Sequence, residues 1–192
     1  MNWLAHLFLS EPCPAFRIGN VLPDLVRQSK LECLPEAYQR GIRQHRRIDA
    51  FTDTHPVVRR SILRLGPEYR RFGGILTDMF YDHFLSRAWA SFSAQPLPVF
   101  TAEVYASFDH HREIIPAEAH PPLDGMKDEN WLGNYGEMEG LADTLRRIGL
   151  RFRRPVNLAA AMGVFQQEYT GLEDDFHEFF PTLVKHVAAE NR

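Results

Sequence analysis

Residues 75–92 read ILTDMFYDHFLSRAWASF, and the large apolar side chains in this stretch recur at helical intervals. They make one apolar stripe, formed by Ile75, Met79, Phe80, Phe84, Leu85 and Trp89. Such a stripe is typical of a helix that packs one side against a protein core. The stretch lacks the alternation of apolar and polar residues that indicates a half-buried strand. It therefore predicts a core helix.

Helical signals also cover most of the remaining sequence. Further helices are predicted at residues 3–8, 19–26, 35–51, 57–65, 99–111, 138–148, 155–169 and 172–189. Prolines near several of the starts support these limits, since proline suits the first helical turn. Residues 116–136 contain three prolines and several turn formers, which predict a long loop or lid. No stretch alternates like a strand, and 192 residues suffice for one core, so the sequence predicts a single-domain all-α helical bundle over residues 1–192.

The composition is that of an ordinary globular protein, with 44% hydrophobic and 24% charged residues, and it argues against a disordered or fibrous chain. No run of about 18 apolar residues indicates a membrane span, so no membrane partner is expected. The N-terminal segment has no basic leader and places His6 in its apolar run, which argues against a signal peptide and predicts a cytoplasmic location. Cys13 and Cys33 form no CxxC motif, so a zinc-thiolate site is not expected.

Residues 40–71 form a strongly basic segment, with nine arginines, no lysine and three acids, a formal charge of +6. Arginine binds phosphate and carboxylate groups through two parallel hydrogen bonds. The segment therefore suits an anionic substrate or an acidic protein partner, whereas no nucleic-acid partner is expected. The alternative is a solvated helix face balanced by acids elsewhere in the fold. The candidates for partner binding are Arg40, Arg43, Arg59 and Arg60.

Two aspartates four residues apart, Asp78 and Asp82, share one face of the predicted helix at residues 75–92. His83 is the next residue in the sequence. Carboxylates among apolar neighbours are costly to bury unless a cation neutralises them, so the pattern predicts metal ligands. Alternatively, Asp78 pairs with an arginine and His83 is a hydrogen-bonded core histidine.

A second pair, His45 and Asp49, shows the same spacing, which suits two ligands or a ligand and the residue that orients it. Asp53 follows one turn later and either joins the site or ends the helix. Arg46 is placed to hold a phosphate oxygen or to form a surface salt bridge. His6 lies in an apolar helix, where a histidine is often buried and hydrogen-bonded rather than a ligand. Asp24 follows a proline, where an aspartate can cap a helix as readily as bind a metal ion.

Together these residues supply imidazole and carboxylate groups without thiolate, which suits Mn, Fe, Mg or Zn in a hydrolytic centre. No glycine-rich phosphate loop, GxSxG motif or cysteine nucleophile supports another chemistry. The predicted catalytic residues are His6, Arg46, Asp49 and Asp53. The predicted metal ligands are Asp24, His45, Asp78, Asp82 and His83.

Four motifs carry a family resemblance: MNWLAHL at residues 1–7, GNVLPD at 19–24, HRRID at 45–49 with Thr52 and Asp53, and Asp78 with DHFLS at 82–86. On these motifs the sequence resembles the acyl carrier protein phosphodiesterases, also called ACP hydrolases. The resemblance implies hydrolysis of the phosphodiester that links 4′-phosphopantetheine to a serine of holo-acyl carrier protein, giving the apo form, with Mn²⁺ favoured. It also implies a helical fold distantly related to the HD phosphohydrolases, although Asp82 and His83 stand in the reverse order of the HD pair.

The resemblance gives the arginine-rich segment a partner, because acyl carrier protein is a small acidic protein. Two other functions remain open. One is an HD-like phosphohydrolase of nucleotides or of another small phosphodiester. The other is a non-catalytic helical module that binds acidic proteins.

Overall fold

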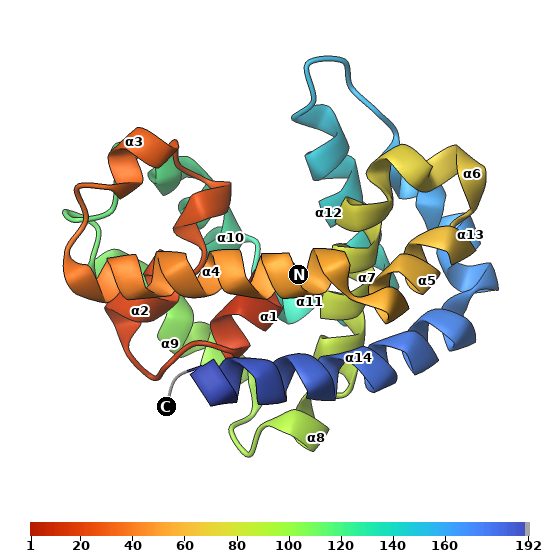
Figure 1. The fold of residues 1–192 in the computed structure, drawn as a ribbon. Helices are drawn as coiled ribbons and strands as arrows, with labels where there is room; N and C mark the ends of the chain where they lie inside the picture. Colours follow the sequence, from red (N-terminus) through yellow and green to blue (C-terminus); the bar gives the residue numbers. More distant parts are fainter. Residues whose placement is uncertain (191–192) are drawn as a thin grey trace.

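The computed structural model describes residues 1–190, which fold into α-helices and short 3-10 helices with no β-strand among them (Figure 1). The first half contains α1 (Trp3–Phe8), α2 (Pro14–Gly19), η1 (Leu22–Asp24), α3 (Gln28–Leu31), α4 (Glu36–Thr54), α5 (Pro56–Arg64), α6 (Gly66–Tyr69), η2 (Arg70–Phe72) and α7 (Gly73–Arg87). The second half contains α8 (Trp89–Phe92), α9 (Leu97–His110), η3 (Ala117–Ala119), α10 (His120–Asp128), α11 (Trp131–Asn134), α12 (Met138–Leu150), η4 (Leu158–Ala161), α13 (Met162–Gln167) and α14 (Tyr169–Glu190). The prediction of an all-α protein is confirmed.

Helix α7 is the central element. It contacts α1, α5, α12 and α14, and Figure 1 shows it between α12 and α5. Its buried residues include polar ones, Thr77, Asp82 and His83, beside the expected apolar stripe. A helix buried on most sides in this way belongs to the core rather than to the surface. The predicted helix at residues 75–92 is divided, since α7 ends at Arg87 and α8 begins at Trp89.

Aromatic rings fill much of the space between α7 and the C-terminal helices. Phe80 stacks on Phe165 with ring centres 4.2 Å apart, and Phe84 lies 5.9 Å from Phe176 of α14. Buried apolar residues from Met1 to Val187 belong to the same hydrophobic core. Among the described helices, none is both long and apolar enough to cross a membrane.

Helices α2 and α4 approach closely because glycine stands at their contact. A Cβ atom on Gly19 would overlap the backbone of Tyr38, and one on Gly41 would overlap the backbone of Phe16. Only glycine permits backbones to come this near. The close crossing places the end of α2, with Asn20, beside His45 on α4.

The structure corrects two expectations about loops. Residues 116–136 are not a long loop, because they contain η3, α10 and α11. Pro121 and Pro122 occupy the first turn of α10. Backbone N–H groups in a first turn have no acceptor within the helix, so a proline there removes no helical hydrogen bond. Conversely, the helix predicted at residues 155–169 begins later and is divided, because residues 155–157 are irregular and η4, α13 and the start of α14 cover most of the rest.

Candidate active site

Two histidines and one aspartate meet where α1 packs beside α4. Asp49 Oδ1 lies 3.1 Å from His6 Nε2, and Asp49 Oδ2 lies 3.0 Å from His45 Nε2. The two imidazole rings stack with their centres 4.2 Å apart. One ligand atom from each of the three residues lies within 4.8 Å of the others, a spacing that can hold one metal ion. The i, i+4 pair on α4 and the histidine of α1 are thus brought together.

Two further aspartates extend this cluster from other elements. Asp24, at the end of η1, places Oδ1 3.5 Å from His45 Nε2, and its Oδ2 accepts a hydrogen bond from Trp3 Nε1 at 2.9 Å. Asp78 on α7 lies 3.1 Å from the amino group of Met1. Figure 1 shows the start of the chain over the middle of α4, where this amino group lies 3.6 Å from Asp49.

Four carboxylates line one small cavity of about 260 Å³: Asp24, Asp49, Asp53 and Asp78. They come from η1, α4 and α7, so three separate elements supply the negative charge. Carboxylates this close to one another stabilise a cation between them and repel one another without it. The donor set therefore fits a hard or borderline divalent metal ion.

Burial and close contacts alter the acidity of these groups. Burial alone would lower the pKa of His45, but the carboxylates of Asp24 and Asp49 outweigh it and raise that pKa to about 10. Burial opposes the charged form of Asp49, yet hydrogen bonds with His45 and His6 hold its pKa well below the usual range. Burial raises the pKa of Asp78 despite the nearby amino group. The cavity thus combines a strongly ionised carboxylate with one that accepts protons more readily.

The hydrogen bonds of Asn20 fix which nitrogen of each imidazole carries a proton. Asn20 Nδ2 donates to the backbone oxygen of His6 at 2.7 Å, so Asn20 Oδ1 is the acceptor that faces His6 Nδ1 at 3.1 Å. The backbone oxygen of Asn20 lies 2.8 Å from His45 Nδ1 and can only accept. Both Nδ1 atoms therefore carry hydrogen, and both Nε2 atoms face Asp49, with His6 Nε2 also 3.1 Å from the backbone oxygen of Met1. Since a neutral Nε2 and a carboxylate are both acceptors, a proton or a metal ion has to lie between them.

Asn20 was not predicted as a site residue. Its sequence motif was recognised, but its partners lie on α1 and α4, and local spacing gives no signal for contacts between separate helices. The hydrogen bond from Trp3 to Asp24 was missed for the same reason.

The structure corrects the predicted ligand roles of Asp82 and His83. Asp82 Oδ2 accepts from the backbone N–H of Leu4 at 2.8 Å, and Oδ1 accepts from that of Ala5 at 3.1 Å. It satisfies free amides in the first turn of α1 and so positions His6. His83 faces the other way, with Nδ1 2.9 Å from the backbone oxygen of Tyr135.

The second nitrogen of His83 is also engaged, because Nε2 lies 3.3 Å from the hydroxyl of Tyr169. The ring stands edge-on to Phe165, with centres 5.3 Å apart. His83 is therefore a hydrogen-bonded core histidine, the alternative that the sequence left open.

Most of the arginines singled out from the sequence already have partners in the chain. Arg40 pairs with Glu11, Arg43 pairs with Glu36, and Arg60 pairs with Asp175 and Glu178. Arg46 is exposed and donates to Gln28 Oε1, and the described residues that line the four-carboxylate cavity do not include it. Arg59 is exposed on α5. Their roles in substrate or partner binding stay predictions.

The fold and the site define an all-helical protein in which four carboxylates line one small cavity and two buried imidazoles contact one of them. The sequence model of the family described as acyl carrier protein phosphodiesterase matches residues 1–183. The chain is 36% identical to an acyl carrier protein phosphodiesterase of Yersinia pestis over 189 residues, which cover 96% of each protein. It is 34% identical to one of Enterobacter sp. (strain 638) over 200 residues, covering 100% of this chain and 99% of that protein.

A third relative, the acyl carrier protein phosphodiesterase of Photorhabdus laumondii, is 31% identical over 193 residues, covering 100% of this chain and 96% of its own. The chain belongs to the acyl carrier protein phosphodiesterase family. The resemblance noted from the four motifs is thereby confirmed. No solved structure matches the chain, so the distant relation to HD phosphohydrolases stays a prediction.

Proposed function

We propose that this protein hydrolyses the phosphodiester between 4′-phosphopantetheine and a serine of holo-acyl carrier protein. The observation that carries the proposal is the contact of His6 and His45 with one carboxylate, Asp49, which itself lines a cavity together with three more carboxylates. Relatives that align over nearly the whole chain are named acyl carrier protein phosphodiesterases. We further propose that the reaction takes place in the cytoplasm.

We infer that the site uses a divalent metal ion, with Mn²⁺ as the first candidate and Mg²⁺, Fe²⁺ and Zn²⁺ as alternatives. The ligands would be His6, His45 and Asp49, joined by Asp24, whereas Asp78, which the sequence predicted as a ligand, is assigned to proton transfer. A metal ion bound there would activate water and shield the charge of the phosphate. The sequence predicted His6 and Asp49 as catalytic residues, but their positions suit binding of a metal ion at least as well as a catalytic role. The orientation of both imidazoles by Asn20 supports the assignment, because it turns the Nε2 atoms inward.

The remaining residues suit the handling of protons. Asp78 is partly exposed and lines the cavity, and its raised pKa favours accepting a proton from the attacking water. Asp53 lines the same cavity and can orient that water. Water adds to phosphorus, the bond from phosphorus to the serine oxygen breaks, and the serine oxygen takes up a proton. The products are apo-carrier protein and 4′-phosphopantetheine.

Incubation with holo-carrier protein and Mn²⁺ should convert it to the apo form. Mass spectrometry of the intact carrier protein would follow the loss of the 4′-phosphopantetheinyl group, and apo-carrier protein serves as the unreactive control. Hydrolysis of nucleotides or of a small aryl phosphodiester with no action on holo-carrier protein would instead favour a general phosphohydrolase. Binding of carrier protein without any hydrolysis would favour the non-catalytic module.

Replacing Asn20 by alanine should weaken the site without touching a ligand atom. The imidazole of His6 would lose its Nδ1 partner and its fixed orientation, so we expect metal affinity and turnover to fall about 10- to 100-fold. Calorimetric titration with Mn²⁺ and steady-state kinetics would measure the two losses. Gln44→Ala is the matched control, because Gln44 is also buried and donates only to the backbone oxygen of Leu9. Equal behaviour of the two variants would contradict the assigned role of Asn20.

A further inference from the structure

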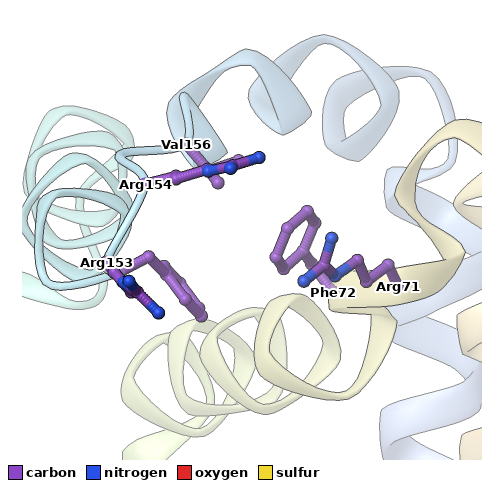
Figure 2. Close-up of a pocket in the computed structure, with 6 residues that line it drawn as sticks. Arg71, Phe72, Arg153, Arg154 and Val156 are labelled. Atoms are coloured by element: carbon purple, nitrogen blue, oxygen red, sulfur yellow. The ribbon is translucent and has the colours of Figure 1, made fainter.

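A second cavity lies near the four-carboxylate cavity and has the opposite charge. It measures about 470 Å³ and is formed by η2 and the irregular chain that follows α12. Figure 2 shows Arg71 and Phe72 on one side facing Arg153 and Arg154 on the other. We call it the arginine pocket, after Arg71, Arg153 and Arg154.

The three arginines of this pocket have no acidic partner within residues 1–190. Arg71 lies over the ring of Phe72, with its guanidinium carbon 5.5 Å from the ring centre. All three are exposed. Several other arginines are neutralised within the chain, as in the pairs of Arg60 with Asp175, Arg112 with Asp124 and Arg147 with Glu129. The arginine pocket therefore carries uncompensated positive charge.

The floor of the pocket is apolar. Phe72 and Phe152 meet edge to face, with ring centres 5.5 Å apart, and Val156 completes the lining. A guanidinium group is weakly hydrated and stacks on aromatic rings while its N–H groups stay available for a carboxylate or phosphate. The combination suits an anionic group carried on an apolar stem and offers nothing to a cation.

The arginine pocket and the four-carboxylate cavity are lined by neighbouring stretches of the same parts of the chain. Ile75 and Ile148 border the four-carboxylate cavity, whereas Phe72, three residues earlier, and Phe152, four residues later, border the pocket. Phe72 ends η2 directly before α7, and Phe152 lies two residues after the end of α12, which packs against α7. Arg71 lies in η2, and Asp78 is the sixth residue of α7, so both cavities border the N-terminal half of α7.

We propose that the arginine pocket seats acidic side chains of the carrier protein while the phosphodiester lies in the four-carboxylate cavity. This rests on the proposed function, which supplies an acidic protein substrate. The phosphate of the substrate is committed to the site of hydrolysis, and the rest of the 4′-phosphopantetheine arm is uncharged. The anionic groups still available to the arginine pocket are carboxylates of the protein that bears the phosphate.

Reversing two charges, as in R153E/R154E, tests the proposal by steady-state kinetics on holo-carrier protein. We expect KM to rise about tenfold or more, with kcat within about twofold, because these residues bind the protein and not the reacting group. The salt dependence of kcat/KM should also flatten. The control is R112E/R146E, which changes the net charge equally at two exposed arginines that pair with Asp124 and Asp143. An unchanged KM in R153E/R154E, or an equal rise in both variants, overturns the proposal.

Binding of apo-carrier protein, measured by fluorescence anisotropy, separates this proposal from the proposed function. Apo-carrier protein keeps its acidic side chains but has no phosphodiester to cleave. If the wild-type protein binds it and R153E/R154E binds it about tenfold more weakly, the docking role holds even where hydrolysis fails. If R153E/R154E loses affinity for inorganic phosphate but keeps its affinity for carrier protein, the pocket serves a small anion and the proposal is wrong.

Discussion

Asp49→Asn should reduce the release of 4′-phosphopantetheine about 10³-fold or more, the largest loss that we expect from one isosteric change. The carboxylate of Asp49 lies against both imidazoles, with contacts of 3.1 Å to His6 and 3.0 Å to His45. An amide keeps the shape but loses the negative charge, and its NH₂ group cannot ligate a metal ion. Mass spectrometry of the carrier protein would measure turnover, and circular dichroism would confirm that the helices remain.

His83→Gln is the informative comparison for Asp49→Asn. His83 was predicted to bind the metal but bonds to Tyr135 and Tyr169 in the core, so its replacement should cost stability and leave turnover per folded molecule within a few-fold. Loss of turnover in folded His83→Gln protein, together with normal turnover in Asp49→Asn, would place the chemistry elsewhere.

Removal of divalent metal ions by a chelator should abolish turnover, and Mn²⁺ should restore it. The amino group of Met1 offsets only part of the negative charge of the four carboxylates that line the cavity, so the metal ion should also stabilise the fold. At a metal concentration of about 100 times Kd the gain is about 2.7 kcal/mol. For a domain of this size that corresponds to a rise in Tm of roughly 5–10 °C.

Thermal melts with and without Mn²⁺ provide a readout that does not depend on the substrate. The increase in Tm should be absent in Asp49→Asn, whereas R153E/R154E should retain it, because the arginine pocket lies outside the cluster of ligands. Full turnover in metal-free protein would refute the metal mechanism. Comparison of Mn²⁺, Mg²⁺, Fe²⁺ and Zn²⁺ at equal concentration would identify the preferred ion.

The sequence predicted the parts of the site whose geometry is set within one helix. His45 and Asp49 lie one turn apart on α4, so their spacing alone places them on one face. Asp82 satisfied the same rule with Asp78, yet its oxygens are taken by backbone amides of α1. No spacing along α7 distinguishes these two aspartates, because the distinction depends on which other helix packs against each position.

The helical class could be predicted for a similar reason, since apolar periodicity is a local property. The errors lie at residues 19–26, where only Leu22–Asp24 form a 3-10 helix after α2 ends, at the division of the 75–92 helix after Arg87, and at residues 116–136 and 155–157. In the last two segments the role of proline was misinterpreted, since two prolines lie in the first turn of α10, whereas the single proline at position 155 lies in irregular chain. Leu123 and Met126 of α10 are buried in the core and stabilise that helix, a contact that proline positions do not indicate.

The stability of α1 depends on neighbouring helices, and this dependence determines how the active site is lost when the protein unfolds. This helix has six residues, too few to persist alone in water, and two amides of its first turn are held by Asp82. Its residues from Trp3 to Leu7 are nonetheless buried in the core, so the segment cannot open without exposing core side chains. Because His6 lies on this segment, the reactive geometry is coupled to cooperative unfolding, and we expect catalysis and the helical signal to be lost together on heating.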